Sequence, residues 1–237
     1  MTKANMEEEL SRMKSEHHEN LRIGFSCTGL RSLIYRAVRQ TRSADPSLKI
    51  TLQELTSGEI ENSLINHRLD LGFITLPAAS SEVCTELMME EYVLLGVPST
   101  HPLAGTGTAT KSLKYPWIDL NRFKNSSFIL RNTGTRFREI TDRLFAQCNY
   151  EPEIATSARN HFSCMEFSEE WNMLFFTTES FIKNLKNPHS MHFFITGSPP
   201  EKVPVGMAYR RGETLSIPAY RLVHTMNRLI SENAGES

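Results

Sequence analysis

Three strand-like and two helix-like segments fill the stretch that decides the fold, 21-LRIGFSCTGLRSLIYRAVRQTRSADPSLKITLQELTSGEIENSLINHRLDLGFIT-75. Apolar and polar residues alternate in 21–26 and in 49–55, as in half-buried strands, and 69–75 is more continuously apolar. Between the strands, apolar residues recur at helical spacing, first at Leu30, Leu33, Ile34, Ala37 and Val38, then at Ile60, Leu64 and Ile65. The order strand, helix, strand, helix, strand predicts a parallel sheet covered by helices.

A second unit of the same kind follows. Residues 127–131 are expected to form a strand, 132–135 a turn, 137–148 an amphipathic helix and 152–156 a returning strand. Thr56 and Glu59 have the spacing of a capping box at the start of the second helix of the first unit. Other strands are expected at 92–97, 173–177, 191–195 and 203–210, and other helices at 162–167, 181–185 and, capped by Ser216 with Pro218, 216–232.

Composition excludes several classes of protein. The 237 residues allow one or two domains, and 26 basic against 27 acidic side chains give a net charge of -1, without the basic excess typical of a chain that holds nucleic acid. The four cysteines are far apart in sequence, which predicts reduced thiols in the cytoplasm, and no apolar run is long enough to span a membrane. The first residues are acidic and lack a hydrophobic signal core, so secretion is not expected. Residues 1–20 carry a narrow amphipathic seam that fits either a helix leaning on a partner or a tail.

The search for catalytic and metal-binding motifs is negative. His17 and His18 are adjacent and so point to different sides of a helix, while His189 and His192 have no acidic neighbours, so no metal site is expected. The sequence has no phosphate-binding loop, no dinucleotide-binding glycine pattern and no nucleophile elbow, and no cofactor is expected. Cys27 could act as a nucleophile, but a small buried thiol is the simpler interpretation.

Short polar side chains gather where predicted strands lead into helices. In open α/β sheets ligands bind beyond the carboxyl ends of the strands, and helix N-termini there offer free backbone N–H groups that favour anions. Each hydroxyl could instead be an ordinary helix cap. Because such turns occur in both units, we predict one shared anion site formed by Ser26, Cys27, Thr28, Thr56, Ser57, Thr75, Asn132, Thr133 and Thr135.

The order of several weak motifs resembles one family, the effector-binding (co-inducer) domain of LysR-type transcriptional regulators. The segments that carry the resemblance run across 21–232 and include LRIGF (21–25), DPSLKITLQE (45–54), LDLGFI (69–74), LLGVPSTHPLA (94–104), WIDL (117–120), FIL (128–130), GTR (134–136), LF (144–145) and EPEI (151–154). Two departures stand out. His67 replaces a usual glycine, and Trp171 with Met173 stands where the family has a glycine-rich stretch near the effector, so a bulky Trp171 is expected to narrow or block the cleft.

The resemblance implies an α/β protein with the two-lobed periplasmic-binding-protein-like (type II) fold, in which each lobe is a mixed sheet flanked by helices. Lobe I would be 21–98 plus 204–237, lobe II would be 99–203, and 1–20 would be a remnant of the linker helix or a tail. A small effector would bind between the lobes, with no catalysis. The family's winged helix-turn-helix has no counterpart in the 237 residues, so DNA binding would depend on that missing domain.

The sequence leaves more than one possibility open for the oligomeric state and for the function. The resemblance implies a homodimer or tetramer, with dimer contacts through the helix faces of 30–43 and 136–148, and no membrane partner. A solute receptor outside gene regulation could share the fold, and so could an enzyme such as a deaminase, dehydratase or phosphoribosyltransferase. An enzyme would need an acid–base pair or clustered arginines, for which Arg131, Arg136 and Arg138 are the nearest approach.

Overall fold

The computed structural model describes residues 20–26, 30–149, 151–185 and 190–235. The chain divides into two compact units, and we describe each by itself. Unit 1 comprises the residues before Thr28 together with Arg31–Met88 and Gly206–Ser237, and unit 2 comprises Thr28–Leu30 and Met89–Val205. The expected helix of 1–20 lies outside the described residues apart from Asn20, and the predicted lobe boundaries at 98/99 and 203/204 stay predictions.

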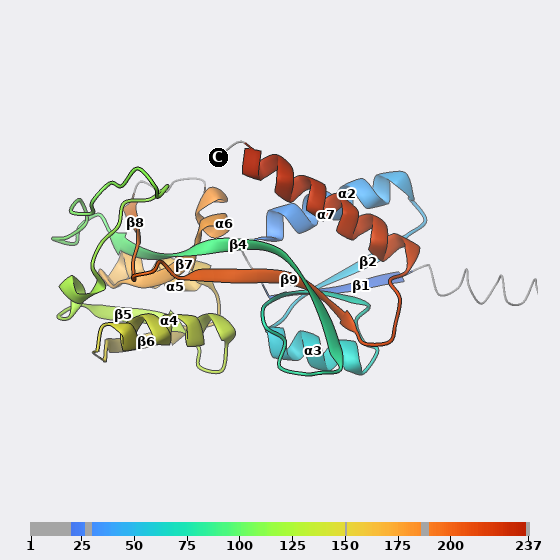
Figure 1. Ribbon diagram of the computed structural model, residues 1–237, viewed down its shortest axis with the longest axis horizontal. Helices are drawn as coiled ribbons and strands as arrows, with labels where there is room; N and C mark the ends of the chain where they lie inside the picture. Colours follow the sequence, from blue (N-terminus) through green and yellow to red (C-terminus); the bar gives the residue numbers. More distant parts are fainter. Residues whose placement is uncertain (1–19, 27–29, 150, 186–189, 236–237) are drawn as a thin grey trace, which may run out of the picture. The chain divides into compact units, whose positions relative to one another are not determined.

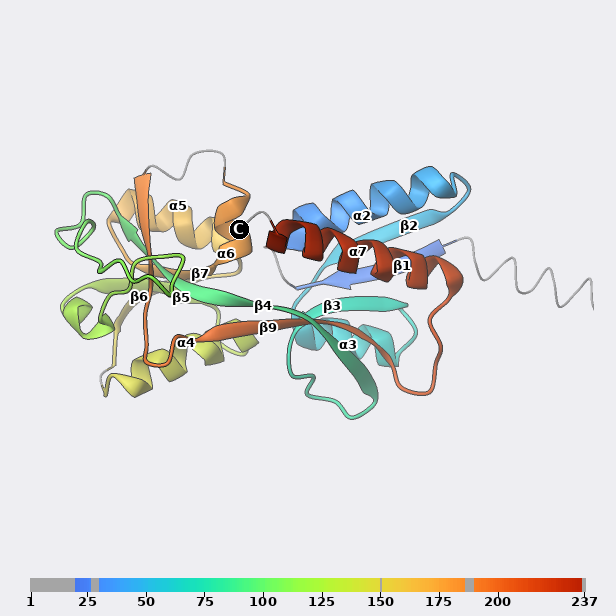
Figure 2. The same ribbon diagram turned by 45° about the horizontal axis from the view of Figure 1, so that its top comes forward.

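Unit 1 is built on a sheet of strands in the order β2-β1-β3-β9. The parallel pairing predicted for the first three strands is confirmed, because β1 lies parallel to β2 with Phe25 opposite Glu54, and parallel to β3 with Phe25 opposite Phe73. Helices α2 and α7 lie side by side over one face of this sheet, and α3 covers the other (Figures 1 and 2). The elements are β1 Asn20–Phe25, α2 Arg31–Ala44, β2 Lys49–Glu54, α3 Ser57–Ile65, β3 Leu71–Thr75 and α7 Ile217–Gly235, with the second part of β9 Lys202–Arg210, whose first part up to Val205 belongs to unit 2.

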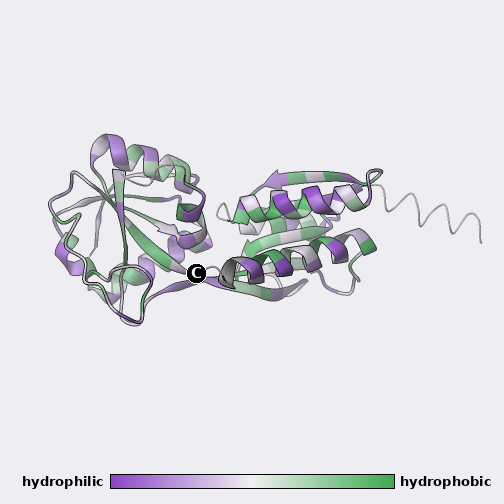
Figure 3. Ribbon diagram, turned by 90° about the horizontal axis from the view of Figure 1, so that it is seen from above, coloured by the Kyte–Doolittle hydropathy of each residue, from purple (hydrophilic) through white to green (hydrophobic). Residues whose placement is uncertain are grey.

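Hydrophobic burial fixes these helices on the sheet. On α2 and α7 the hydrophobic bands alternate with hydrophilic ones along each helix (Figure 3), and the buried set on α2 is Leu33, Ile34, Ala37 and Thr41. Beneath α3 lies a core cluster of Ile60, Leu64, Leu69, Ile74, Val83 and Ala208. Each fully buried Leu or Ile side chain contributes about 1.5–3 kcal/mol to the free energy of folding. Burial of the periodic apolar residues of α3 therefore holds this helix on the sheet.

Unit 2 contains two sets of strands. β4 pairs antiparallel with β7 and with β8, and β5 pairs parallel with β6 across a register shift at Phe128/Ile129. Helix α5 packs on β5, β6 and β7, and α4 packs on β5. The elements are β4 Val83–Pro98, the 3-10 helix η2 Leu120–Phe123, β5 Ser127–Arg131, α4 Arg136–Gln147, β6 Glu153–Ala158, α5 His161–Trp171, β7 Phe175–Thr178, α6 Glu179–Lys183 and β8 Met191–Ile195.

Strand β4 is longer than its sequence pattern predicts. The expected strand began at Tyr92, but β4 begins at Val83. Residues 84–90 are half-buried or exposed and show no alternation of apolar and polar residues, so their sequence pattern does not predict a strand. Close approach of the backbone at β9 explains the pairing here: a Cβ on Gly206 would lie 2.5 Å from the carbonyl oxygen of Glu86. Only glycine allows the two strands to come this close.

The final helix starts where the sequence predicted. Ser216 precedes α7, and its Oγ accepts a hydrogen bond from the backbone N–H of Ala219 at 3.4 Å. Pro218 is tolerated because the first N–H groups of a helix have no intrahelical partner. Among the described helices, none combines the length and the apolar character needed to cross a membrane.

Candidate effector site

Unit 1 brings four of the predicted hydroxyls to one edge of its sheet. Ser26 follows β1, Thr56 and Ser57 follow β2, and Thr75 ends β3, and the parallel register aligns these carboxyl ends. The Oγ atoms of Ser26 and Ser57 are 2.9 Å apart, and the Ser26 N–H donates to the carbonyl of Phe73 at 2.9 Å. Ser57 and Thr75 are each 8% exposed. These hydroxyls therefore form a small polar surface in contact with the first turn of α3.

Thr56 is a helix cap within this group. Its Oγ1 accepts the N–H of Glu59 at 3.3 Å and donates to the Glu59 carboxylate at 2.8 Å, while the Thr56 N–H donates to the same carboxylate at 2.7 Å. The capping box predicted from the spacing is confirmed. These bonds use the hydroxyl proton and one lone pair of Thr56, so its hydroxyl has no proton left to donate to a ligand.

The turn between β5 and α4 forms the corresponding edge of unit 2. The Asn132 N–H donates to the carbonyl of Ala158 at 3.0 Å. Thr135 caps α4, since its Oγ1 accepts from the Arg138 N–H at 3.3 Å and donates to the Asn132 carbonyl at 2.9 Å. Gly134 has a φ of 77°, a left-handed conformation that favours glycine. The Thr133 hydroxyl is exposed and forms no hydrogen bond with a described residue, which leaves it available to a ligand.

The positive charge of Arg131 lies next to this turn, and the predicted site, which was based on hydroxyl-bearing turns, did not include it. Arg131 is the last residue of β5, close enough to α5 for its charge to affect His161 and Cys164. Burial, and after it the charge of Arg131, holds the pKa of His161 well below its usual value, so this imidazole is neutral. The sequence signal for it is an arginine at the carboxyl end of a predicted strand, in 127–131.

Of the three arginines weighed for an enzyme, Arg138 has bonds within its own helix and to the neighbouring turn. The Arg138 guanidinium donates through Nε to Asp142 at 2.7 Å and through Nη1 to the Arg131 carbonyl at 3.2 Å. The guanidinium group of Arg138 is therefore hydrogen-bonded within its own helix and to the neighbouring turn. Arg131 is the basic residue at the end of β5.

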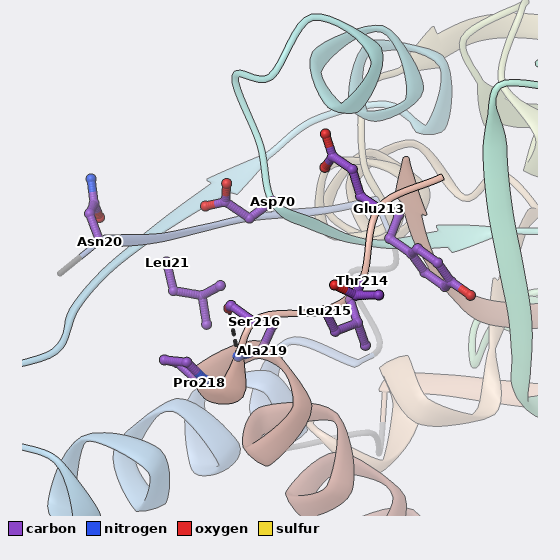
Figure 4. A pocket seen from close by; sticks show the side chains of 10 residues that line it. Asn20, Leu21, Asp70, Glu213, Thr214, Leu215, Ser216, Pro218 and Ala219 are labelled. Carbon is purple, nitrogen blue, oxygen red and sulfur yellow. Dashed lines mark hydrogen bonds between the residues drawn. The ribbon is translucent and has the colours of Figure 1, made fainter. Parts of the chain in front are cut away.

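Two hollows in unit 1 lie away from the predicted site residues. The first, of about 120 Å³, is at the other edge of the sheet, where Asn20 and Leu21 begin β1 (Figure 4). Among its lining residues, Asp70 is paired with Arg22 at 2.6 Å and Glu213 with Arg210 at 2.9 Å. The second, of about 460 Å³, runs along α2 past Tyr35.

The remaining predicted features have different outcomes. Cys27 and Thr28 lie outside the described residues. Among those that are described, no group of three or more His, Cys, Asp or Glu could hold a metal. Burial raises the pKa of Cys164 to about 12, so this thiol stays protonated at neutral pH. Trp171 ends α5 with 51% of its surface exposed and its ring against Phe167, at a centroid distance of 4.9 Å; the expectation that it blocks the effector cleft stays a prediction.

Comparison with known proteins agrees with this architecture. The chain is similar to the effector-binding domain of a BenM variant, with a TM-score of 0.75 and 21% identity over 91% of this chain and 96% of that one. It is also similar to the Synechocystis PCC6803 CcmR regulatory domain, with a TM-score of 0.77 and 15% identity over 89% and 96% of the two chains. These similarities show the type II periplasmic-binding-protein-like α/β fold.

Sequence comparison identifies the family. A curated relative, the HTH-type transcriptional regulator YeiE of Escherichia coli K12, is 28% identical over 137 residues, which are 57% of this chain and 43% of YeiE. The chain thus matches less than half the length of that relative. The family described as the LysR substrate binding domain matches residues 14–229. This chain belongs to the LysR substrate-binding domain family.

Proposed function

We propose that this chain senses a small anionic metabolite for a transcriptional regulator and leaves that metabolite chemically unchanged. The observation that carries the proposal is the pairing of the Ser26 and Ser57 hydroxyls at the strand ends of unit 1, beside the N-terminus of α3. In unit 2 the Thr133 hydroxyl, which forms no hydrogen bond with a described residue, is a further donor close in sequence to the positive charge of Arg131. Helix N-termini and an arginine both favour a carboxylate or a phosphate.

Relatives support an anionic ligand. Solved structures of similar domains hold benzoate in BenM, shikimate in QuiR and 2-PG in CcmR. At 15–20% identity, these proteins share the fold, and their ligands suggest which compounds to screen first. We propose a carboxylate or phosphate as the common recognition element, held by strand-end turns of the kind that Ser26 and Ser57 form.

Calorimetry with a panel of aromatic, alicyclic and phosphorylated organic acids tests this. For a ligand found in the panel, Ser57→Ala in unit 1 and Thr133→Val in unit 2 should each weaken binding about 10- to 100-fold, as expected for the loss of one hydrogen bond to a charged group. Thr51→Val, an exposed position within β2, is the matched control and should leave affinity unchanged. A ligand whose affinity neither site variant changes would refute this location. Recovery of a chemically altered ligand would support the enzyme alternative.

DNA recognition and cellular location follow from the same proposal. Curated relatives are HTH-type regulators, and one solved relative, CbnR, is bound to its target DNA. We propose that DNA is contacted through a helix-turn-helix domain of the regulator, in the cytoplasm, and that residues 20–235 bind the effector only. A gel-shift assay in which this chain alone binds duplex DNA tightly would contradict the division of roles.

We also propose self-association through the face of α2. Arg36, Arg39 and Arg42 are exposed there and form no salt bridge with a described residue, and Arg39 and Arg42 line the hollow beside Tyr35. The helix face 136–148 and the neighbouring β6 carry charges of both signs. Their exposed residues with no salt bridge in the described chain are Glu139, Glu151 and Glu153, next to Ile154, which is 40% exposed.

These three glutamates are possible partners for the arginines of α2, which supports the pairing of α2 with α4 and β6 of a second copy. Sedimentation should show a dimer at tens of micromolar, and the charge reversals Arg39→Glu and Arg42→Glu together should convert it to monomer. A wild-type chain that sediments only as monomer would refute this contact.

A further inference from the structure

The hollow along α2 combines apolar and basic side chains. It has a volume of about 460 Å³, and its lining residues are Tyr35, Val38, Arg39, Arg42, Ser43 and Pro46. The first four are three or four residues apart, so their side chains lie on one face of the helix. Pockets for small molecules have volumes of about 300–1,000 Å³. This hollow, called the α2 hollow below, is therefore large enough for a ligand of one or two rings.

The basic part of the α2 hollow consists of two arginines. Arg39 and Arg42 are exposed, and neither guanidinium group forms a hydrogen bond or a salt bridge with a described residue. The nearest acid along the chain, Asp45, does not line the hollow, and its carboxylate accepts hydrogen bonds from the Ser47 N–H at 3.2 Å and the Ser47 hydroxyl at 2.7 Å. Two neighbouring guanidinium groups favour an anion, because each can bind a carboxylate through charge-assisted hydrogen bonds.

The apolar part of the α2 hollow is built around Tyr35. This residue is 50% exposed, and its ring packs edge-on against Phe25 at a centroid distance of 6.4 Å and an interplanar angle of 84°. Phe25 is itself 2% exposed at the end of β1, so it limits the orientations of the Tyr35 ring. Val38 and Pro46 add apolar surface. A flat ring can remove its surface from water here, whereas a small inorganic anion gains nothing from this part of the hollow.

We propose that the α2 hollow is a second small-molecule site and that it binds an aromatic carboxylate. The carboxylate pairs with the two arginines, and the ring lies against Tyr35 and Pro46. None of the described residues predicted for the effector lines this hollow. The site therefore does not depend on the function proposed above, and the two can be tested separately.

Occupation of the α2 hollow affects the proposed self-association through α2. A ligand and a second copy would use the same guanidinium groups of Arg39 and Arg42, so each excludes the other. An aromatic carboxylate should therefore shift the chain towards monomer. A chain that sediments only as monomer would refute the α2 contact alone and would leave the ligand site accessible.

Fluorine NMR of the full chain labelled with fluorotyrosine observes the hollow directly. The Tyr35 resonance is assigned by its loss in Tyr35→Phe and is followed at about 10 µM chain, where mass action disfavours dimers. Three probes are titrated: naphthoate, the uncharged naphthalenemethanol of similar shape, and sodium sulfate. Naphthoate should shift the Tyr35 resonance with a Kd on the order of 1 mM, as expected for a ligand of this size in an open hollow. The other two probes should bind at least about tenfold more weakly, because each lacks the charge or the ring.

Substitutions of single arginines test the assignment. Arg39→Gln and Arg42→Gln should each weaken naphthoate binding about tenfold, since each removes a charge-assisted pair. Arg36→Gln is the matched control and should leave the Kd unchanged, because Arg36 is an exposed arginine of the same helix that does not line the hollow. A Tyr35 resonance that does not move in up to about 20 mM naphthoate would overturn the proposal. So would equal losses of affinity in all three variants, or equal affinities for naphthoate and naphthalenemethanol.

Discussion

Two threonines in one turn of unit 2 should behave differently when their hydroxyls are removed. Thr135 caps α4 with two hydrogen bonds, to the Arg138 N–H at 3.3 Å and the Asn132 carbonyl at 2.9 Å. Thr133 makes none with a described residue. Valine keeps the branched shape of threonine, so each Thr→Val substitution tests the hydroxyl. The hydroxyl of Thr135 is therefore expected to stabilise the fold, and the hydroxyl of Thr133, two residues earlier, is expected to bind the ligand.

The size of the difference follows from those bonds. Loss of a threonine cap costs about 1 kcal/mol, and loss of the second hydrogen bond adds up to about 1 kcal/mol. Thr135→Val should therefore destabilise unit 2 by about 1–2 kcal/mol. Thr133→Val should change stability by less than about 0.5 kcal/mol, as is usual at an exposed position, while weakening effector binding.

Urea unfolding followed by tryptophan fluorescence is suited to this comparison. The two tryptophans of the chain, Trp117 and Trp171, both belong to unit 2, and the Trp117 Nε1–H donates to the Gly197 carbonyl at 3.0 Å. Their fluorescence thus reports the unfolding of this unit. Equal stability losses in the two variants, or a loss only in Thr133→Val, would refute the assignment of Thr135 as the cap and Thr133 as the ligand donor.

Three further predictions concern stability. Phe128→Ala should destabilise unit 2 by about 3–5 kcal/mol, since this fully buried ring contacts Phe145 at a centroid distance of 5.0 Å; a change in the urea midpoint below that of Thr135→Val would contradict it. Burial raises the pKa of the Glu91 carboxyl group, although hydrogen bonds from Ser180 act in the opposite direction. The contribution of Glu91 to the free energy of unfolding is therefore full below the ordinary glutamate pKa of about 4.3, and it is lost as the pH rises through the pKa of Glu91 in the folded protein. Glu91→Gln should flatten this decline in unfolding free energy measured from about pH 4 to pH 8, and an unchanged slope would argue against a buried carboxylate. Gly206→Ala should cost about 1–3 kcal/mol by thermal unfolding because its Cβ would meet a backbone oxygen, whereas Gly58→Ala, with open space around it, should be neutral or stabilising; equal effects would contradict the close approach of β4 and β9.

The local elements of this protein were determined by its sequence. Apolar alternation in 21–26 and helical spacing around Ile34 produced β1 and α2 where they were expected, because these patterns report which side of an element is buried. The Thr56–Glu59 capping box formed as its spacing required, since both partners lie within one helical turn. Local patterns of this kind depend on near neighbours and need no knowledge of the rest of the chain.

Tertiary structure decided what each polar residue does. Thr56 and Ser57 are adjacent and chemically alike, but only the packing of β1 beside α3 brings Ser57 to within 2.9 Å of Ser26. Arg131 became a candidate because α5, thirty residues later in the chain, returns to the end of β5. The first half of β4 was missed because it pairs through backbone atoms with a strand more than a hundred residues away. Hydrogen bonding between distant backbones and the distance between charges depend on how the chain returns on itself, and a linear pattern of side chains carries no record of that path.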